Sequence, residues 1–321
     1  MIALKTAAPP LTPAPDLAEL VTRLAANVAA AVVVEPAKLR LIIAALVARG
    51  HVLLEDVPGV GKTLVAKALA RSLDAEFKSV QCTPDLLPSD KTGSSLYDQR
   101  RQEFTLLPGP LFAHVVLLDE INRATPRTQS SLLEALAEGQ VTTDGVTRRL
   151  EQPFFVIATQ NPVETAGTFP LPEAQLDRFL FSLSLGYPGA EAELRILEQE
   201  EHHSPLAGLG PVLALADVLR LQEAVLRVNV ARPVKEYIVQ LVLATRGHPE
   251  AVLGVSPRGG VAVQRAAQAM ALLAGRDFVT PDDVKAVAPA AMAHRLITRQ
   301  RGLAAGQAVV AAVLAQVPVP V

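Results

Sequence analysis

Aromatic residues are scarce in this chain of 321 residues, and so are cysteine and net charge. Tryptophan is absent, and 3 tyrosines and 9 phenylalanines make up the aromatic set, which argues against a stacking surface for sugars or nucleobases. Cys82 is the single cysteine, so neither an internal disulfide nor a CxxC zinc motif is available. This composition fits a reducing compartment, and we expect a cytoplasmic protein.

The charges nearly cancel, and no part of the chain reads as a targeting or membrane segment. The 30 Lys and Arg against 32 Asp and Glu give a formal net charge of -2, which disfavours a protein that coats nucleic acid. Residues 1–15 are rich in proline and alanine without the apolar run of a secretory signal, so we expect a flexible tail. Residues 302–321 carry no charged side chain, but we expect a terminal helix packed in a core rather than a membrane span.

The hydrophobic content and its pattern along the chain predict two domains. Half of the residues are hydrophobic, which is enough for a sizeable core. Residues 16–205 alternate short apolar segments with helical patterns, which is typical of a parallel sheet covered on both faces. The predicted strands are 52–55, 77–81, 114–118 and 154–159.

Helix signals dominate the rest of the chain. Asp16 is a candidate cap for a first helix, and Thr125, Pro126 and Gly139 bound a helix over 126–138. After about residue 200 the strand pattern stops, so residues 206–321 are predicted to be all-α. The helices expected there are 217–228, 233–246, 257–274 and 281–296.

The segment EDVPGVGKT (55–63) lies between a predicted strand and a predicted helix, the context that a phosphate-binding loop requires. Glycines let backbone N–H groups approach phosphate oxygens, and the helix N-terminus adds a partial positive charge. Lys62 would contact the β- and γ-phosphates, and the Thr63 hydroxyl would bind Mg²⁺. Asp56 stands where the general pattern has its first glycine. The alternative is a glycine-rich turn without a ligand.

Two further strands end in polar residues. HVVLLDE (114–120) ends in Asp119, a candidate Mg²⁺ ligand, and Glu120, which would polarise the attacking water. Asp119 lies 57 residues after Lys62 (119 − 62), a spacing that allows the two strands to be neighbours. FFVIATQNP (154–162) ends in Asn161, which would orient that water. A strand leaving the core and an Asn-Pro turn are the structural alternatives.

The sequence around these strand ends resembles the AAA+ ATPases, and the MoxR family in particular, which is related to magnesium-chelatase ATPase subunits. The similar segments are DEINRATPRTQSSLLEALAEGQVT (119–142), ATQNPVETAGTFPLPEAQLDRF (158–179) and SPRGG (256–260). The resemblance implies a P-loop NTPase core, an AAA+ αβα sandwich with a parallel sheet, followed by an all-α lid. It also implies a homo-oligomer, usually a hexameric ring.

Site roles follow from the resemblance position by position. The Walker A loop corresponds to Gly59, Val60, Gly61, Lys62 and Thr63, with Leu64 directly after it; Asp119 and Glu120 correspond to Walker B and Asn161 to the first sensor. Arg178 corresponds to the arginine finger and Arg258 to the second sensor. A surface ion pair with Asp177 is the alternative for Arg178, and a tolerated exposed arginine is the alternative for Arg258.

Two insertions complete the pattern. Alternation around Asp144-Gly145 predicts a hairpin over 140–151, and residues 94–106 resemble the helix-two insert of the family. Their arginine pairs, Arg100-Arg101 and Arg148-Arg149, either form positive rings around a pore or are simply solvated. Tyr97 and Phe104 are expected to make the second segment a contact surface.

The sequence thus predicts an ATPase that uses ATP and Mg²⁺ to remodel or mature other proteins. The resemblance implies a partner with a von Willebrand factor type A domain and a client protein complex, as in cofactor or metal insertion. A nucleic-acid motor is disfavoured by the net charge of -2. A nucleotide-gated assembly scaffold is disfavoured by the presence of both Walker carboxylates.

Overall fold

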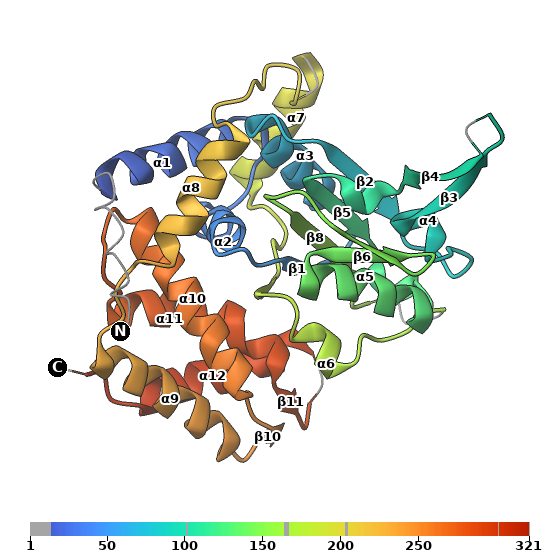
Figure 1. Ribbon diagram of the computed structural model, residues 1–321. Helices are drawn as coiled ribbons and strands as arrows, with labels where there is room; N and C mark the ends of the chain where they lie inside the picture. The colour runs from blue at the N-terminus through green and yellow to red at the C-terminus, as the bar shows by residue number, and fades with distance from the viewer. Residues whose placement is uncertain (1–13, 101, 164–166, 203–204, 301, 321) are drawn as a thin grey trace, which may run out of the picture.

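The computed structural model describes residues 14–100, 102–163, 167–202, 205–300 and 302–320 (Figure 1). The first part of the chain forms α1 (Ala14–Ala31), α2 (Pro36–Val47), β1 (Val52–Glu55), α3 (Lys62–Ser72), β2 (Phe77–Gln81), α4 (Ser89–Thr92), β3 (Gly93–Asp98), β4 (Glu103–Pro108), η1 (Pro110–Phe112), β5 (Val115–Asp119), η2 (Ile121–Arg123), α5 (Pro126–Glu138), β6 (Gln140–Thr143), β7 (Val146–Arg149), β8 (Phe155–Gln160), α6 (Glu173–Leu176), β9 (Phe181–Leu183) and α7 (Ala190–His202). The second part forms α8 (Leu215–Val225), α9 (Arg232–Arg246), β10 (Ala251–Leu253), α10 (Pro257–Leu273), α11 (Pro281–Met292), η3 (Ala293–Arg295), β11 (Ile297–Thr298) and α12 (Leu303–Gln316).

Five parallel strands form the central sheet, in the order β2-β5-β8-β1-β9. The four predicted strands are confirmed to within one residue, and β9 is a three-residue strand that the pattern did not reveal. The sequence spacing allowed the strand before Lys62 and the strand that ends at Asp119 to be neighbours. They are not neighbours, because β8 lies between them and pairs with both β1 and β5. Sequence spacing limits how many strands lie between two motifs, but the lateral order depends on tertiary packing.

Both faces of the sheet are buried, as the continuously apolar strands predict. Along β5, Leu117 belongs to one apolar core while Val116 and Leu118 belong to the other, since successive side chains point to opposite faces. The first core also contains Leu24 of α1 and Val310 of α12, and so runs from the sheet into the carboxyl-terminal helices. The second core is covered by the buried face of α5.

The carboxyl-terminal part is helical, and α9 to α12 lie below and to the left of the sheet in Figure 1. Ser256 caps α10 by accepting a hydrogen bond from the Gly259 N–H (3.2 Å), and Thr280 and Asp283 form the predicted capping box of α11. The all-α prediction misses one feature, the antiparallel pair β10–β11. Strands of three and two residues are too short to show an alternating pattern, so only the tertiary pairing reveals them.

The amino terminus departs slightly from the prediction. Residues 1–13 of the expected tail lie outside the described residues, and α1 already begins at Ala14. Asp16 therefore lies in the first turn of α1 rather than at its cap. A carboxylate there still interacts favourably with the helix dipole. Within the described ranges, no helix combines the length and hydropathy that crossing a membrane requires.

Two antiparallel hairpins extend from the core. The predicted hairpin is confirmed as β6–β7, with positive φ at both Asp144 (53°) and Gly145 (75°), as a type I′ turn requires. Residues 94–106 fall within the hairpin β3–β4, which projects from the body in Figure 1. Its exposed Tyr97 and Phe104 rings pack across the strands with centroids 5.2 Å apart. Arg101 lies outside the described residues.

Candidate active site

The loop between β1 and α3 has the geometry that phosphate binding needs. Gly59 (φ 87°) and Gly61 (φ 86°) adopt left-handed backbone conformations that glycine tolerates best. Lys62 begins α3, and its Nζ donates to the carbonyl oxygens of Asp56 (2.8 Å) and Val57 (3.3 Å). Desolvation lowers the pKa of Lys62, and nearby carboxylates, led by Asp56, oppose that shift. A lysine held over the loop by carbonyl groups can exchange them for phosphate oxygens.

Asp56 has a structural role that the sequence did not reveal. Its buried carboxylate accepts hydrogen bonds from the Ser184 hydroxyl (2.7 Å) and from the backbone N–H groups of Leu185 (2.6 Å) and Gly186 (3.0 Å). These residues follow β9. These hydrogen bonds therefore hold the start of the phosphate-binding loop against the segment that follows β9. The lysine contact uses the Asp56 carbonyl, which any residue at this position supplies.

Asp119 and Glu120 stand at the carboxyl end of β5 and are joined through Thr159 of β8. The Thr159 hydroxyl donates to Asp119 Oδ1 (2.5 Å) and accepts from the Glu120 N–H (2.9 Å). Glu120 adopts φ 53°, an uncommon conformation for a residue with a side chain, directly after the strand. Thr159 is thus a residue of the site, to which the sequence analysis assigned no role.

Two donors engage the Glu120 carboxylate. Oε2 accepts from Gln81 Nε2 at 2.8 Å and forms an ion pair with Arg123 Nε at 3.1 Å. Gln81 ends β2 and lies opposite Asp119 in the parallel register of β2 and β5. The carboxylate is therefore held toward β2.

Asn161 directly follows β8 and is largely buried. Its Oδ1 accepts a hydrogen bond from the Val163 N–H (3.1 Å), which is the local turn expected for an Asn-Pro sequence. The side chain also lines the cavity beside the phosphate-binding loop. The turn and a polar role toward a ligand are compatible, because the amide N–H₂ group is not used in the turn.

A cavity of about 370 Å³ brings the separate motifs together. It is lined by Pro58, Gly59, Gly61, Lys62, Thr63, Leu64, Asp119, Glu120 and Asn161. The Thr63 hydroxyl and the Asp119 carboxylate are hard oxygen donors on this one cavity, so the residues present fit Mg²⁺, which usually takes few protein ligands and completes its shell with water and phosphate. Among the described residues, no group of three or more His, Cys, Asp and Glu side chains is arranged to hold a metal.

A second cavity, of about 490 Å³, adjoins the first. The two share Gly59, Gly61 and Leu64, and Val60 lines only the second. Its other walls come from residues 32–38, from residues 185–196 and from Pro205. Val34, Tyr187 and Ile196 are among the apolar side chains in these walls. These segments are far apart in sequence and carry no motif, which is why sequence reasoning did not find them.

Arg178 and Arg258 line neither cavity within the described chain. Arg178 Nη1 donates to the Leu133 carbonyl of α5. Arg258 is mostly exposed, and its Nε lies 3.9 Å from Asp177 Oδ2. The alternative for Arg178, an ion pair with Asp177, is wrong, because the Asp177 carboxylate pairs with Arg258 and Arg295 instead.

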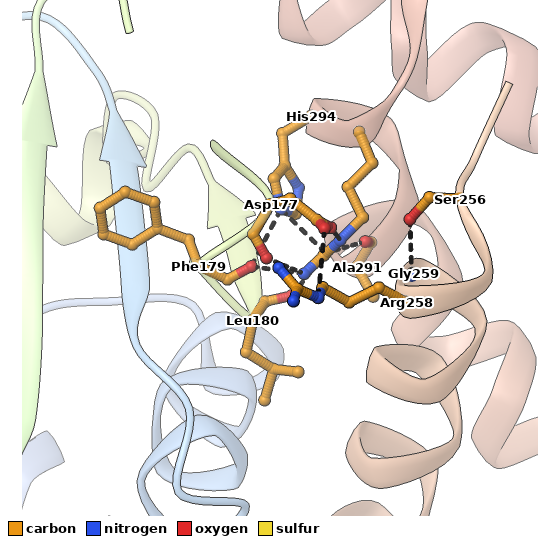
Figure 2. A network of polar contacts seen from close by, with 9 residues as sticks. Asp177, Phe179, Leu180, Ser256, Arg258, Gly259, Ala291 and His294 are labelled. Carbon is orange, nitrogen blue, oxygen red and sulfur yellow. Dashed lines mark hydrogen bonds and ion pairs between the residues drawn. The ribbon is translucent and has the colours of Figure 1, made fainter. Parts of the chain in front are cut away.

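Arg295 is the centre of a buried polar network that sequence reasoning missed. Figure 2 labels partners in this network, among them Asp177, Phe179 and Leu180. Its Nε donates to Asp177 Oδ1 (2.6 Å), and its terminal nitrogens donate to backbone carbonyls that include Phe179 (2.7 Å) and Leu180 (3.2 Å). Burial lowers the pKa of Arg295, and Asp177 opposes that shift. Burial and the neighbouring guanidinium also hold the pKa of His294 well below its ordinary value. The network joins the helical part to the segment that contains Arg178.

The comparisons with known proteins agree with this geometry. A family model described as "ATPase family associated with various cellular activities (AAA)" matches residues 51–181, and an AAA lid domain model matches residues 243–313. The uncharacterized protein YeaC of Bacillus subtilis is 54% identical over 284 residues, which cover 88% of this chain and 89% of the relative. Chaperone MoxR1 of Mycobacterium tuberculosis is 43% identical over 269 residues, which cover 81% of this chain and 71% of the relative.

A solved structure has the same fold over nearly the whole chain. It is a crystal structure of a protein from Cytophaga hutchinsonii that is assigned as an ATPase. The superposition has a TM-score of 0.87 at 34% identity and covers 96% of this chain and 97% of that chain. The similarity therefore includes the sheet and the helical part that follows it.

Proposed function

The chain belongs to the MoxR family of AAA+ ATPases, and we propose that it hydrolyses ATP with Mg²⁺ at the boundary between two subunits in order to remodel other proteins. One observation carries the proposal. The glycine-rich loop, Lys62, Thr63, both carboxylates of β5 and Asn161 all line one cavity at the carboxyl edge of a parallel sheet, where open α/β sheets bind their ligands.

Each side chain has a part in the proposed reaction. The backbone N–H groups of the loop and Lys62 hold the phosphates, while Thr63 and Asp119 hold Mg²⁺. When bound, Mg²⁺ would neutralise charge on the phosphate oxygens. Glu120 polarises the water that attacks the γ-phosphorus, and Asn161 orients it.

The second cavity supports a place for the nucleoside part of ATP. It adjoins the loop at Gly59, Gly61 and Leu64 and is walled by side chains such as Val34 and Tyr187. The walls also include charged residues such as Glu35 and Lys38. Apolar walls with a few polar groups suit a purine, because the base gains from leaving water and needs few polar contacts for orientation.

Arg178 is proposed to act on the nucleotide of a neighbouring subunit, and Arg258 is proposed to report the nucleotide state to the lid. Among the described residues, Arg178 does not line either cavity of its own chain, which supports a role toward a neighbour. An arginine supplied from another subunit stabilises the charge of the transition state. A homo-oligomer, as a ring of six, follows from the family resemblance, with residues 16–205 as the nucleotide-binding core and residues 206–321 as the lid.

The work served by hydrolysis is proposed to be maturation of a client protein complex in the cytoplasm, with a partner that carries a von Willebrand factor type A domain. A relative with 43% identity is named a chaperone. The exposed Tyr97 and Phe104 pair on the β3–β4 hairpin offers an apolar contact surface for a protein. Loss of stimulated, but not basal, ATPase activity in a Tyr97→Ala, Phe104→Ala variant is the expected result.

Two variants test the central proposal. A Glu120→Gln chain is expected to bind ATP but scarcely turn it over, and unchanged turnover would remove Glu120 from its role. Mixing Lys62→Ala chains with Arg178→Ala chains is expected to restore part of the activity, because one type of boundary then keeps both residues. No recovery would overturn the shared site.

Turnover stimulated by DNA in a salt-sensitive manner would instead support a nucleic-acid motor, and assembly that needs ATP binding alone would support a scaffold.

A further inference from the structure

Helix α7 has two faces with different surroundings. Ala192, Arg195 and Ile196 line the larger cavity. Leu194 and Leu197 point away from it, since they lie about half a turn around the helix from those residues, and they are 56% and 65% exposed. Leucines three positions apart share one helix face. The outward face of α7 is therefore apolar and has no cover within the described chain.

Carboxylates border this outward face. Glu193 lies on one side of the Leu194–Leu197 stripe, while Glu191 and Glu198 lie on the other. All three are exposed. The described part of α7 thus presents an amphipathic surface in which exposed leucines run between acidic residues.

A groove of about 350 Å³ lies between α9 and α10 in the lid. Ile238 and Val242 are buried at its floor, whereas Val239, Leu243 and Val261 are each more than half exposed on its walls. Gly260 also lines the groove. A Cβ there would stand 3.5 Å from the Val242 methyl group, in ordinary van der Waals contact with the groove floor.

The charges at the groove are positive. Lys235 and Arg246 line it from opposite ends of α9, eleven residues apart (246 − 235). No carboxylate is among the described residues that line it. An apolar groove with a cation at each end is complementary to an apolar helix face bordered by carboxylates.

The two surfaces cannot meet within one chain. Figure 1 shows α7 at one end of the structure and α9 at the opposite end. A second copy of the chain can bring them together. Pro257 lines the groove and directly precedes Arg258, while α7 lines the nucleotide-side cavity. A neighbour's α7 seated in the groove would therefore bring Arg258 close to α7, with that neighbour's cavity on the far side of the helix.

We propose that the α9–α10 groove of one copy binds the outward face of α7 of the next copy. Leu194 and Leu197 enter the groove, and the carboxylates beside them pair with Lys235 and Arg246. The inference deepens the proposed function, because it rests on the proposed assembly of subunits, and it names the contact that sets the lid of one subunit against the nucleotide cavity of another. It does not depend on hydrolysis.

Cross-linking of full-length chains tests the contact. Cys82 is fully buried, and burial raises its pKa to about 12, so the native thiol gives little background. Chains with Leu197→Cys are mixed with differently tagged chains with Val239→Cys, and a short bis-maleimide is added. A product that contains both tags is expected. Chains with Leu226→Cys, a similarly exposed position at the end of α8, replace Val239→Cys as the matched control and should give no such product.

Absence of the mixed product, while sedimentation shows that the chains still assemble, would overturn the inference. So would a cross-link formed within one diluted chain that carries both cysteines. As a second measurement, Leu194→Ser with Leu197→Ser is expected to shift the assembly toward smaller species, while Leu226→Ser leaves it unchanged; an unshifted assembly contradicts the contact. These substitutions are on exposed residues, so folding is retained.

The cross-linking experiment can succeed or fail independently of the test of ATP hydrolysis. Cross-linking without ATP turnover would reject hydrolysis and keep the contact. Recovery of turnover in mixed Lys62→Ala and Arg178→Ala chains without cross-linking would keep the shared site and reject the contact.

Discussion

Arg295 of the lid donates a hydrogen bond from its Nε to Oδ1 of Asp177 across 2.6 Å, and Asp177 is the residue before Arg178. The Arg295 side chain is almost completely buried, so its charge is compensated by Asp177 and by backbone carbonyls rather than by water. The pair fixes the lid against the segment that carries the proposed arginine finger. The lid and the segment that contains Arg178 are therefore connected through this pair.

Removal of Asp177 tests this connection. Asp177→Ala is expected to lower the free energy of unfolding by about 3 kcal/mol, because it leaves a buried guanidinium without its counter-charge. Chemical denaturation measures the change. Glu236→Ala, which removes an exposed ion pair with Arg232, is the control and should cost less than about 1 kcal/mol. Equal effects in the two variants would contradict a stabilising role for the buried pair.

Asp56 is predicted to be needed for stability although it departs from the general P-loop pattern. Asp56→Gly removes the acceptor of the Ser184, Leu185 and Gly186 hydrogen bonds. We expect a loss of about 2–4 kcal/mol, since buried donors are left unsatisfied. Asp56→Asn retains an acceptor oxygen and should lose less. Denaturation curves measure both variants, and an Asp56→Gly protein as stable as the parent would refute the role.

Gln81 is predicted to restrain Glu120. In the structure its amide and Arg123 both engage the same carboxylate oxygen of Glu120, which is then less available to accept a proton from water. Gln81→Leu removes one of these donors, and we expect basal kcat to rise by up to about tenfold, the effect of about 1.4 kcal/mol. Steady-state ATPase assays measure it, with Gln316→Leu on the exposed end of α12 as the matched control. A fall in kcat would show instead that Gln81 orients Glu120 for the reaction.

His51 is predicted to make stability depend on pH. It is buried, its Nδ1 accepts from the Val156 N–H (3.1 Å), and its Nε2 therefore donates to the Leu136 carbonyl (3.1 Å). Burial lowers its pKa from 6.5 to about 4, opposed by the Leu136 bond. Between these values the unfolded chain binds more protons than the folded chain, so stability falls as pH falls from about 6.5 to about 4, by at most about 1.4 kcal/mol per pH unit.

The contribution of this residue is obtained from a variant. His51→Gln is less stable than the parent at neutral pH, but the difference between the two proteins shrinks as the pH falls through this window. Denaturation at several pH values measures the difference. His248→Gln, at a partly exposed position, serves as the control. Parallel curves for the parent and His51→Gln would show that the buried imidazole does not set the acid sensitivity.

The local parts of the fold were predictable because their signals are local. The predicted strands were short apolar segments, and α5 begins and ends where Thr125, Pro126 and Gly139 place it. The Asp144-Gly145 turn required only that both residues accept positive φ. The motif residues were found for the same reason, since Gly59 to Thr63 follow β1 within a few residues and Asp119, Glu120 and Asn161 lie at the ends of β5 and β8.

Interactions between distant segments were not predictable in this way. The position of β8 between β1 and β5, the pair β10–β11, and the roles of Gln81, Thr159 and Arg295 depend on residues that meet only after folding. The walls of the larger cavity come from residues 32–38 and 185–196, and neither segment carries a motif.

The amino-acid sequence by itself determined the order of strands and helices along the chain and the residues of the phosphate-binding loop, because backbone preferences and hydrophobic periodicity act over a few residues. Tertiary structure alone decided the lateral strand order and the hydrogen-bond partners of Asp56 and Asp177, because those contacts are selected by packing across the whole core. Tertiary structure also decided that the outward face of α7 and the lid groove are exposed at opposite ends of the folded structure.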